Sequence, residues 1–546
     1  MANTVCLFCS LGCELEIETD GKEAKRIKYL PESRLNQGSL CPRGNSLLEL
    51  LNHPARLIAA SERMEDRFVQ IRLDEAIAKI SDRLKGVADS FAVIIGANAT
   101  NEEISLARSL GGENFALGTE PQDLDILLGL SKEVSYGTPE ELSQSNCTIA
   151  VGDVFTKHPA LAKRVLEARY KSRDNLLITL DTKNGRTSWF ADYHVQISPG
   201  AEALALAHML DPSSFSEALG EASSALQDAA KRFREAEVGF ILISGGFGQI
   251  GDGAACAALA CRLAKSCPGR KYVLPLFTYG NVEGAFKSVL PHKTVAQIIE
   301  EIYQGRIKAL FSFGYDLLSA YPHERVREAL EKLELLVVSS PFENESAKLA
   351  HFLLPESVWL EREGTVLTAF GIEHKLEPVL PPPGDAKSDG ELIKALSQGI
   401  ESAPVELKEP KSIDLNERVS NLAASLGGER LLVFQSDTMN FADGSITGKL
   451  SWISRNSAPP ALNISKDDAA ELGLEDGDEV ILKGDGRELR LPVKLSQLLP
   501  KGVLSLPSWH REARGFPIWK MDAETGNFIV SPVSVSLERT GIGHEG

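Results

Sequence analysis

"CLFCSLGCELEIETDGKEAKRIKYLPESRLNQGSLCPRGN", residues 6–45, contains half of the eight cysteines of the chain. Cys6, Cys9, Cys13 and Cys41 are separated by two, three and 27 residues. Thiolates placed so close together repel one another, and either a tetrahedral zinc ion or a 4Fe-4S cluster supplies the positive charge that they need. Zinc sites usually consist of two short-spaced pairs, whereas three crowded ligands and one distant ligand suit a cuboidal cluster. The spacing therefore favours a 4Fe-4S cluster, with structural zinc as the alternative and a disulfide framework as a third.

The segment between Cys13 and Cys41 alternates apolar and polar residues around Asp20-Gly21, which predicts a β-hairpin with a tight turn. The hairpin would carry the chain away from the first three cysteines and back to the fourth. Arg43 follows Cys41 by two residues. A fixed cation at this place would favour the reduced form of the cluster or touch an anionic cofactor, and a surface salt bridge is the alternative role.

Length and charge restrict what the rest of the chain can be. A chain of 546 residues should form three or four domains, and its 43% hydrophobic and 25% charged residues are typical of a soluble globular protein. The net charge of −18 argues against nucleic acid as a partner. We find no apolar run long enough for a transmembrane helix and no room for a signal peptide before Cys6, so we expect a cytoplasmic protein. In a reducing compartment the other cysteines would remain buried thiols: Cys147, Cys256, Cys261 and Cys267.

After the cysteine segment, apolar runs alternate with helical patterns. The residues that we expect to form buried strands are 91–98, 147–153, 175–181, 238–246, 308–314 and 333–341, with a helix expected over 74–90. Alternation of this kind predicts parallel sheets covered by helices. Most of these strands end in Gly or Asp, and ligands bind at the carboxyl ends of strands in such sheets. Residues 377–416 have the prolines and charges of an extended connection around one short helix, and short strands after it predict a small β-barrel.

Together these residues resemble the molybdopterin oxidoreductase family, which is also called the dimethyl sulfoxide reductase superfamily. It includes formate dehydrogenase alpha subunits and the large iron-sulfur subunit of NADH-quinone oxidoreductase. Cys6-x2-Cys9-x3-Cys13-x27-Cys41-Pro-Arg-Gly is similar to the N-terminal 4Fe-4S domain of the family. Further similar segments are "VGDVFTKHPALAKRV", "LDTKNGRTSWFADYHVQISPGAEALAL", "YGNVEGA" and "ALNISKDDAAELGLEDGDEV".

The resemblance implies a multi-lobed α/β fold with doubly wound parallel sheets and a C-terminal double-psi β-barrel. The domains would be a cluster domain (1–57), an α/β lobe (58–146 and 315–376), a Rossmann-like nucleotide-binding lobe (147–314), a linker (377–428) and the barrel (429–546). Family members hold molybdenum or tungsten in a bis(pyranopterin guanine dinucleotide). By resemblance, Arg43 would lie between cluster and pterin. The residues expected to contact the cofactor are Asp181, Pro199, Gly200, Gly280 and Asn281.

The chain departs from the family where the metal ligand is expected. Catalytic members supply Cys, selenocysteine, Ser or Asp from the segment that here reads "NATNEEISLARSLGGENFALGTEPQDLDILLG", residues 98–129. No Cys or Ser follows "ENFALG", and Asp123 is the only nearby candidate, for which a solvated loop carboxylate is the alternative. We likewise expect His158, His351 and His510 to be structural, and Glu356, Glu361 and Glu363 to lie on a solvated face.

Two functions therefore compete. In the first, the chain is an iron-sulfur oxidoreductase subunit that passes electrons through one 4Fe-4S cluster within a multi-subunit complex. In the second, it is an active molybdenum or tungsten enzyme such as a formate dehydrogenase catalytic subunit. The missing ligand favours the first. Both imply partner subunits that carry flavin or iron-sulfur clusters. A structural scaffold with bound zinc is a further alternative.

Overall fold

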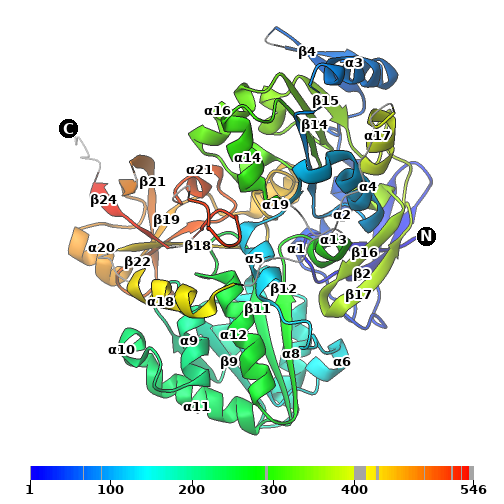
Figure 1. Cartoon of the computed structure of the whole chain (residues 1–546). Helices are drawn as coiled ribbons and strands as arrows, with labels where there is room; N and C mark the ends of the chain where they lie inside the picture. Colours follow the sequence, from blue (N-terminus) through cyan, green and yellow to red (C-terminus); the bar gives the residue numbers. More distant parts are fainter. Residues whose placement is uncertain are drawn as a thin grey trace, which may run out of the picture.

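The computed structural model describes residues 2–65, 67–87, 89–288, 293–398, 413–425, 430–484, 486–517, 520–530 and 532–539. Its strands form a small N-terminal sheet, two parallel α/β sheets, a hairpin and a C-terminal sheet. In Figure 1 the five-stranded lobe lies below, the seven-stranded lobe above, and the C-terminal domain to the left, opposite the N-terminal sheet.

The N-terminal sheet consists of β1 (Ala2–Cys6), β2 (Cys13–Thr19) and β3 (Ala24–Tyr29), all antiparallel. The predicted hairpin is therefore confirmed. Its turn begins at Asp20, whose Oδ1 accepts the N–H groups of Lys22 and Glu23 at 2.9 Å each. Gly21 has φ +88°, a conformation that a residue with a side chain rarely adopts. The first and third cysteines thus lie directly opposite each other, at the end of β1 and the start of β2.

The seven-stranded sheet has the order β5-β4-β15-β14-β13-β6-β7. Its strands are β4 (Ala60–Met64), β5 (Arg67–Ile71), β6 (Phe91–Gly96), β7 (Phe115–Gly118), β13 (Ala309–Phe313), β14 (Leu335–Ser340) and β15 (Phe352–Pro355). The five strands from β15 to β7 are parallel. The expected domain boundary after residue 314 puts β13 in the nucleotide-binding lobe, but β13 pairs with β6 and β14 in this sheet, because sequence order does not show which neighbours a strand pairs with.

The five-stranded sheet has the order β10-β9-β8-β11-β12 and is parallel throughout. Its strands are β8 (Cys147–Val151), β9 (Leu176–Asp181), β10 (Tyr193–Gln196), β11 (Val238–Ser244) and β12 (Arg270–Leu276). In both large sheets the strand order reverses near the middle, between β6 and β13 in one and between β8 and β11 in the other. Such reversal points are where doubly wound sheets bind ligands.

Helices cover both parallel sheets and join the domains. Those of the N-terminal and seven-stranded parts are α1 (Pro42–Asn45), α2 (Leu47–Asn52), α3 (Leu73–Lys85), α4 (Asn101–Gly111), α5 (Pro121–Gly129), α14 (Val295–Tyr303), α15 (Leu317–Ala320), α16 (Glu324–Glu331) and α17 (Asp389–Leu396). Those near the five-stranded sheet are α6 (Pro139–Leu142), α7 (Val154–Lys157), α8 (Leu161–Lys171), α9 (Glu202–Leu210), α10 (Ser216–Leu219), α11 (Ala222–Glu235), α12 (Gly253–Ser266) and α18 (Leu415–Ser425). α13 (Val282–Ser288) packs against α4, α5 and the strand at Gly364–Thr368. In the described part of the connection expected over 377–416, α17 is the one short helix, and α18 begins at its end.

The hairpin β16 (Gly364–Thr368) and β17 (Ile372–Leu376) packs beside the N-terminal sheet (Figure 1). The C-terminal sheet is β23-β18-β22-β19-β21-β20-β24. Its elements are β18 (Leu431–Gln435), β19 (Leu462–Ser465), β20 (Glu479–Gly484), β21 (Arg487–Ser496), β22 (Val503–Pro507), β23 (Val533–Ser534) and β24 (Ser536–Arg539), with α19 (Ser451–Asn456), α20 (Lys466–Leu472) and α21 (Arg511–Arg514). Because β23 and β24 are consecutive and pair with opposite ends of the sheet, it closes almost into a barrel, as predicted.

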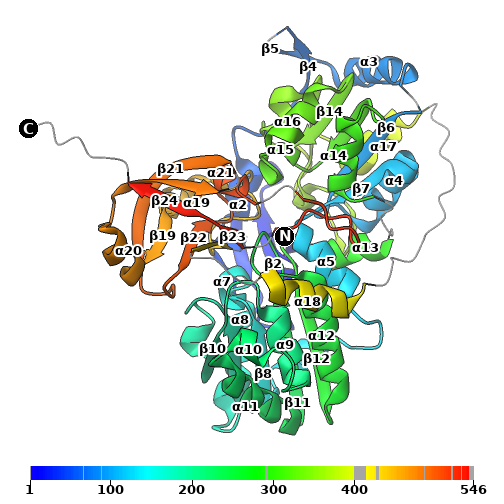
Figure 2. The same cartoon turned by 60° about the vertical axis from the view of Figure 1, so that its left-hand side comes forward.

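Two hydrophobic cores hold the molecule together. One is shared by the N-terminal sheet and both parallel sheets, and the other fills the barrel. Figure 2 shows the barrel beside the two lobes, with the N-terminal strands behind it. Cys147, Cys256, Cys261 and Cys267 are free and buried, as expected. No helix in the described ranges combines the length and the apolar character that crossing a bilayer requires.

Candidate functional site

The four N-terminal cysteines converge on one side of the N-terminal sheet. Cys6, Cys9 and Cys13 are buried, and Cys41 is partly covered. Burial raises the pKa of the Cys13 thiol well above its ordinary value, and repulsion from Cys9, Cys6 and Cys41 raises it further. The four sulfurs therefore lie within electrostatic reach of one another and require a cationic centre to become thiolates.

A single metal ion and a 4Fe-4S cluster need different arrangements of their donor atoms. In the described part of the chain, no group of three or more His, Cys, Asp or Glu side chains converges as the ligands of one metal ion do. A tetrahedral zinc needs all four sulfurs about 2.3 Å from one point, whereas the irons of a 4Fe-4S cluster are spread in space. The sequence spacing of the four cysteines, three close together and one distant, suits the cluster.

Contacts from distant parts of the chain fix the loop that carries the first three cysteines. The Phe277 N–H donates to Ser10 Oγ at 2.8 Å, and the Trp359 indole donates to the carbonyl of Val5 at 3.1 Å. Gly280 lies against Leu7, because a Cβ at Gly280 would come within 2.5 Å of the Leu7 Cβ. Gly280 is therefore needed for close packing against the cysteine loop.

Arg43 is 2% exposed and points behind the cysteines, where it donates to the backbone carbonyl of Lys157. Burial alone would lower the pKa of its guanidinium, but the nearby Cys41 and Cys9 thiols more than reverse this and raise it. Arg43 therefore remains a fixed cation beside the cysteines, as the sequence predicts, rather than a member of a surface salt bridge.

Replacing Arg43 with Met should lower the reduction potential of the cluster. The cation stabilises the additional electron of the reduced state, so we expect a fall of about 60 mV, which is one decade in the equilibrium constant of a one-electron couple. A redox titration followed by electron paramagnetic resonance measures it. Arg43→Lys, which keeps the charge, is the matched control, and an unchanged potential in Arg43→Met would contradict this role.

Behind Arg43 lies a second buried cation that sequence reasoning missed. Lys157 ends α7, is 4% exposed, and donates to the carbonyl of Gly245 and, at 2.8 Å, to Thr278 Oγ1. Asp123 is nearby and fully buried in α5, so its expected role as a solvated loop carboxylate is wrong. Burial raises the pKa of Asp123 to about 6, against the opposing effect of Lys157. Its Oδ2 accepts the Thr278 N–H at 2.8 Å.

These charges occupy the reversal point of the five-stranded sheet. Gly245 follows β11, and its carbonyl is taken by Lys157, while a Cβ at Gly245 would lie 2.4 Å from Asp123 Oδ1. The cavity that remains beside Arg43 and Lys157 has a volume of about 20 Å³. That is room for about one water molecule.

The reversal point of the seven-stranded sheet is closed in a similar way. Arg362 lies there with three carboxylates, at 3.1 Å from Glu103, 2.9 Å from Glu356 and 3.0 Å from Asp389, and all four side chains are buried. Glu356 Oε1 would be 3.0 Å from a Cβ at Gly314, the residue that follows β13. The adjoining cavity has a volume of about 50 Å³. The expectation of a solvated face for Glu356 is therefore wrong.

Glu361 is also buried. Its carboxylate accepts two hydrogen bonds from the Arg56 guanidinium, at 3.0 and 2.7 Å, which compensate the buried charge. Of the three acids that the sequence predicts on a solvated face, Glu356, Glu361 and Glu363, only Glu363 is exposed as expected. His351 accepts the Leu336 N–H at 2.9 Å, which agrees with a structural role. Asn281 also has its amide fully engaged within the protein: it donates to Ala99 and Asn101 and accepts from Leu367.

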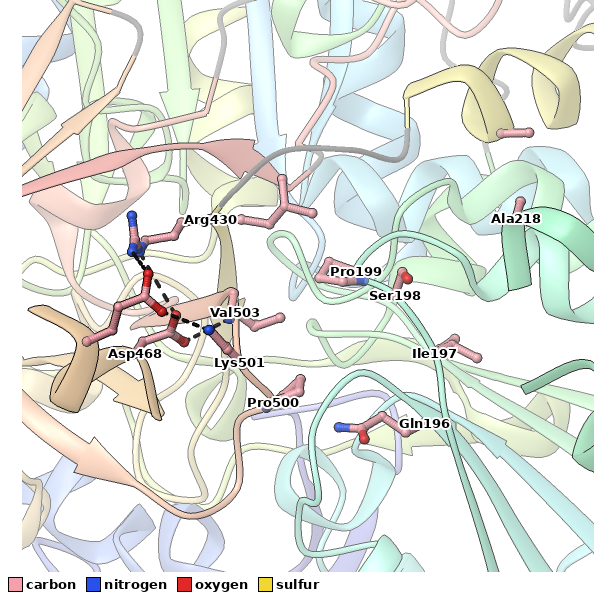
Figure 3. A pocket seen from close by; sticks show the side chains of 14 residues that line it. Gln196, Ile197, Ser198, Pro199, Ala218, Arg430, Asp468, Pro500, Lys501 and Val503 are labelled. Atoms are coloured by element: carbon pink, nitrogen blue, oxygen red, sulfur yellow. Dashed lines mark hydrogen bonds and ion pairs between the residues drawn. The ribbon is translucent and has the colours of Figure 1, made fainter. Parts of the chain in front are cut away.

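Asp181, Pro199 and Gly200 do come together. They line one cavity of about 20 Å³ at the carboxyl end of β9, closed on the barrel side by Phe434 and Pro532. Burial raises the pKa of Asp181 to about 6. Beyond Pro199, a groove of about 830 Å³ opens between the five-stranded lobe and the barrel (Figure 3). Its charged side chains pair with one another, since Lys501 lies 2.7 Å and Arg430 3.7 Å from Glu471.

The chain matches three models of one family over most of its length. Residues 50–399 match "Molybdopterin oxidoreductase", residues 1–53 match its Fe4S4 domain, and residues 438–534 match the molydopterin dinucleotide binding domain. The chain belongs to the molybdopterin oxidoreductase family. The matched Fe4S4 domain agrees with the four converging thiols and supports a 4Fe-4S cluster. The match to the dinucleotide-binding domain is compatible with a molybdenum or tungsten pterin as a second cofactor.

Similar proteins of the family are subunits of oxidoreductases. The NADPH-Fe(3+) oxidoreductase subunit alpha of Geobacter sulfurreducens is 25% identical, over 93% of this chain and 71% of its own length. The F420-dependent formate dehydrogenase subunit alpha of Methanocaldococcus jannaschii is 25% identical, over 73% of this chain and 70% of its own. Acetylene hydratase from Pelobacter acetylenicus has the same fold, with a TM-score of 0.74 at 14% identity over 99% of this chain and all of its own.

The cavities at the two reversal points and at Asp181 do not fit a pterin dinucleotide as they are arranged. Sites for ligands of this kind need about 300–1,000 Å³, whereas the cavities at the two reversal points and at Asp181 measure about 20, 50 and 20 Å³. The wider groove of Figure 3 is lined by residues of the five-stranded lobe, α18 and the barrel, and Arg43 is not among them. A dinucleotide would have to displace buried, mutually compensating charges, which is costly.

Glu202 should make the stability of the folded protein depend on pH. It begins α9, is 3% exposed and accepts the Gly251 N–H at 3.0 Å, and burial raises its pKa from 4.5 to about 7. Because the folded-state pKa is raised, the contribution of this group to stability is present below pH 4.5 and lost as pH rises through about 7. Gln in its place would accept the same hydrogen bond and stay neutral.

We therefore expect Glu202→Gln to stabilise the protein at pH 8 by up to about 3 kcal/mol and to change little at pH 4.5. Thermal unfolding of both variants across this pH range measures the difference. Glu217→Gln, at an exposed residue of α10, is the control. An equal stability of wild type and Glu202→Gln at pH 8 would show that Glu202 is not held in a desolvated site.

Proposed function

We propose that this chain is an iron-sulfur electron-transfer subunit that passes electrons through one 4Fe-4S cluster, bound by Cys6, Cys9, Cys13 and Cys41, within a multi-subunit redox complex. The observation that carries the proposal is a contrast between two regions. The cysteines are assembled for a cluster, while the chain's own charged side chains fill both reversal points where a dinucleotide would lie.

Arg43 would tune the cluster, and the lobes would serve as its scaffold. A 4Fe-4S cluster exchanges single electrons without forming or breaking bonds to substrate, so a subunit of this kind needs no substrate pocket. The names of the similar proteins, alpha subunits of an NADPH-Fe(3+) oxidoreductase and of formate dehydrogenases, support partner subunits that carry flavin or further iron-sulfur clusters. We also propose that the complex is cytoplasmic.

The second candidate is an active molybdenum or tungsten enzyme. It is favoured by the matched dinucleotide-binding domain and by Asp123, whose Oδ1 is buried and has no hydrogen-bond partner in the described structure. For this function the two closed regions would have to open around the cofactor.

Elemental analysis of anaerobically purified protein separates the candidates. We expect about four irons per chain and no stoichiometric molybdenum, tungsten or zinc. Molybdenum or tungsten near one per chain would show that the protein is an active enzyme of this kind, and would contradict the proposed role as an electron-transfer subunit alone. Zinc in place of iron, in a colourless protein, would establish the structural scaffold instead.

A further inference from the structure

The four cluster thiols differ in how deeply they lie in the protein. Residues 4–13, which carry the first three cysteines, are buried without exception. Residues 37–42 are all partly exposed, and Cys41, among the eight cysteines that the structure describes, is the one that is not buried. Water and small reagents therefore reach the ligands of the cluster first at Cys41.

Hydrogen bonds from the interior hold the three buried thiols in place. Ser10, the residue after Cys9, donates its N–H to the Phe277 carbonyl at 3.1 Å and accepts the Ala369 N–H at 2.6 Å. The other two buried thiols face each other at the ends of the paired strands β1 and β2. Moving any of these thiols away from its iron would therefore disturb the strand pairing or contacts with distant parts of the fold.

The segment that leads to Cys41 is held by contacts nearer the surface. Arg34 pairs with Glu140 at 2.9 Å, and both side chains are exposed, at 68% and 43%. The Cys41 carbonyl accepts the N–H of Asn45 at 3.0 Å and its Nδ2 at 3.1 Å, four residues along the chain. Solvent-exposed hydrogen bonds that are local in sequence open at a lower free energy than contacts of the core. Cys41 is therefore the ligand that can move away from the cluster most easily.

Arg43 provides a counter-charge for a thiolate at this position. It is 2% exposed, donates to the Lys157 carbonyl and interacts with the Cys41 side chain. A guanidinium beside a cysteine stabilises its thiolate, which is the reactive form. Without its iron, Cys41 would therefore be a nucleophile that is also accessible.

We propose that Cys41 is the releasable ligand of the cluster. When a one-electron oxidant removes an electron from the cluster, the iron on Cys41 leaves as Fe²⁺, and the other three irons stay on the buried thiols as a 3Fe-4S core. This rests on the proposed function, because it requires the cluster to be bound by these four cysteines.

The step conserves atoms and electrons. The bond between the released iron and Cys41 Sγ breaks together with the bonds of this iron to the cluster sulfides. The thiolate stays on Cys41, water binds the Fe²⁺, and the electron reduces the oxidant. Fe²⁺ and one electron from an external reductant reverse the step. Cys41 thus makes the cluster responsive to oxidants without loss of the remaining irons.

The test identifies which thiol becomes reactive in the cluster-loaded full chain. An equimolar amount of ferricyanide, a one-electron oxidant, is added without oxygen, and N-ethylmaleimide follows. The chain is then unfolded, the remaining thiols are labelled with iodoacetamide, and mass spectrometry reads the label on each cysteine. Iron is measured by elemental analysis, and electron paramagnetic resonance detects the 3Fe-4S core. Cys256, a free buried thiol of α12, is the control for general unfolding.

We expect iron to fall from about four to about three per chain, and maleimide to label Cys41 at least about tenfold more than any other cysteine. Fe²⁺ with dithionite should restore the fourth iron and protect Cys41 again. Equal labelling of the four ligands or of Cys256, labelling of a buried ligand before Cys41, or four irons retained in excess ferricyanide would overturn the proposal. A chain that contains no iron before oxidation would instead refute the proposed function.

Two variants test the same assignment without an oxidant. Cys41→Ala should retain about three irons per chain and show the signal of a 3Fe-4S core, whereas Cys13→Ala, which removes a buried ligand, should lose the cluster. Loss of all iron in both variants would contradict a cluster that can release one iron and keep the rest.

Discussion

Cys9→Ala is expected to lose the cluster, with iron falling from about four per chain to near zero and the visible absorption disappearing. Cys9 is 7% exposed, so the sulfur that the variant loses comes from the protein interior. Without the cluster, Cys6 and Cys13 would stay protonated, because burial raises the pKa of both thiols. Iron, sulfide and absorption are measured on the anaerobically purified variant.

The matched control for Cys9→Ala is Cys256→Ala, which removes an equally buried thiol from α12. It should retain iron and colour at the wild-type level. If Cys9→Ala contained as much iron and sulfide as the wild type, these four cysteines could not be the ligands of the cluster. Loss of iron in both variants would point to general instability instead.

Arg362→Met is expected to destabilise the seven-stranded lobe by about 3–5 kcal/mol, because it leaves three buried carboxylates without their cation. Burial alone would lower the pKa of Arg362, but Glu103, Asp389 and Glu356 together raise it well above the ordinary value, so the guanidinium is charged in the native state. Thermal unfolding followed by circular dichroism, together with the rate of proteolysis, measures the loss.

The loss in Arg362→Met should also depend on pH. Burial raises the pKa of Glu356 well above 4.5 and that of Asp389 to about 6 even with Arg362 present. Without the guanidinium both carboxyls are neutral at pH 5. Their burial therefore destabilises the folded protein less at pH 5 than at pH 8, where they would be ionised. Arg34→Met is the control: Arg34 pairs with Glu140 at 2.9 Å on the surface, and its loss should change stability little. Equal unfolding of the two variants would show that the network does not hold the lobe.

The sequence alone predicts those features that depend on residues close together in the chain. Cysteine spacing predicted the cluster site, and turn residues predicted the β2–β3 hairpin. Apolar runs predicted six strands of the parallel sheets, which are β6, β8, β9, β11, β13 and β14, but not β7, β10, β12 or β15. They did not show how the strands pair, which is why β13 was assigned to the wrong lobe. The family resemblance supplied the barrel closure and the joining of Asp181 to Pro199.

The buried charges could not be predicted in the same way. "ESVWLEREG" reads as a solvated charged segment, since nothing in it shows that Glu103, 259 residues away, will close on Arg362. Lys157 likewise finds the carbonyl of Gly245, 88 residues later. A charged side chain is usually exposed. It is buried only where the fold places groups that pair with its charge beside it, and these groups can be far away in the sequence. These exceptions fill the two reversal points, which is where doubly wound sheets bind ligands.

The contacts of the cysteine loop determine the order in which the protein can be assembled. Phe277 and Gly280 come from the loop after β12, and Trp359 from a segment after β15, yet all three lie against residues 5–10, the segment that carries Cys6 and Cys9. Iron and sulfide therefore have to be delivered while these later segments are still away from the N-terminal sheet. Maturation of the cluster and final closure of the lobes are thus sequential steps, and a chain that closes first would exclude its own cofactor.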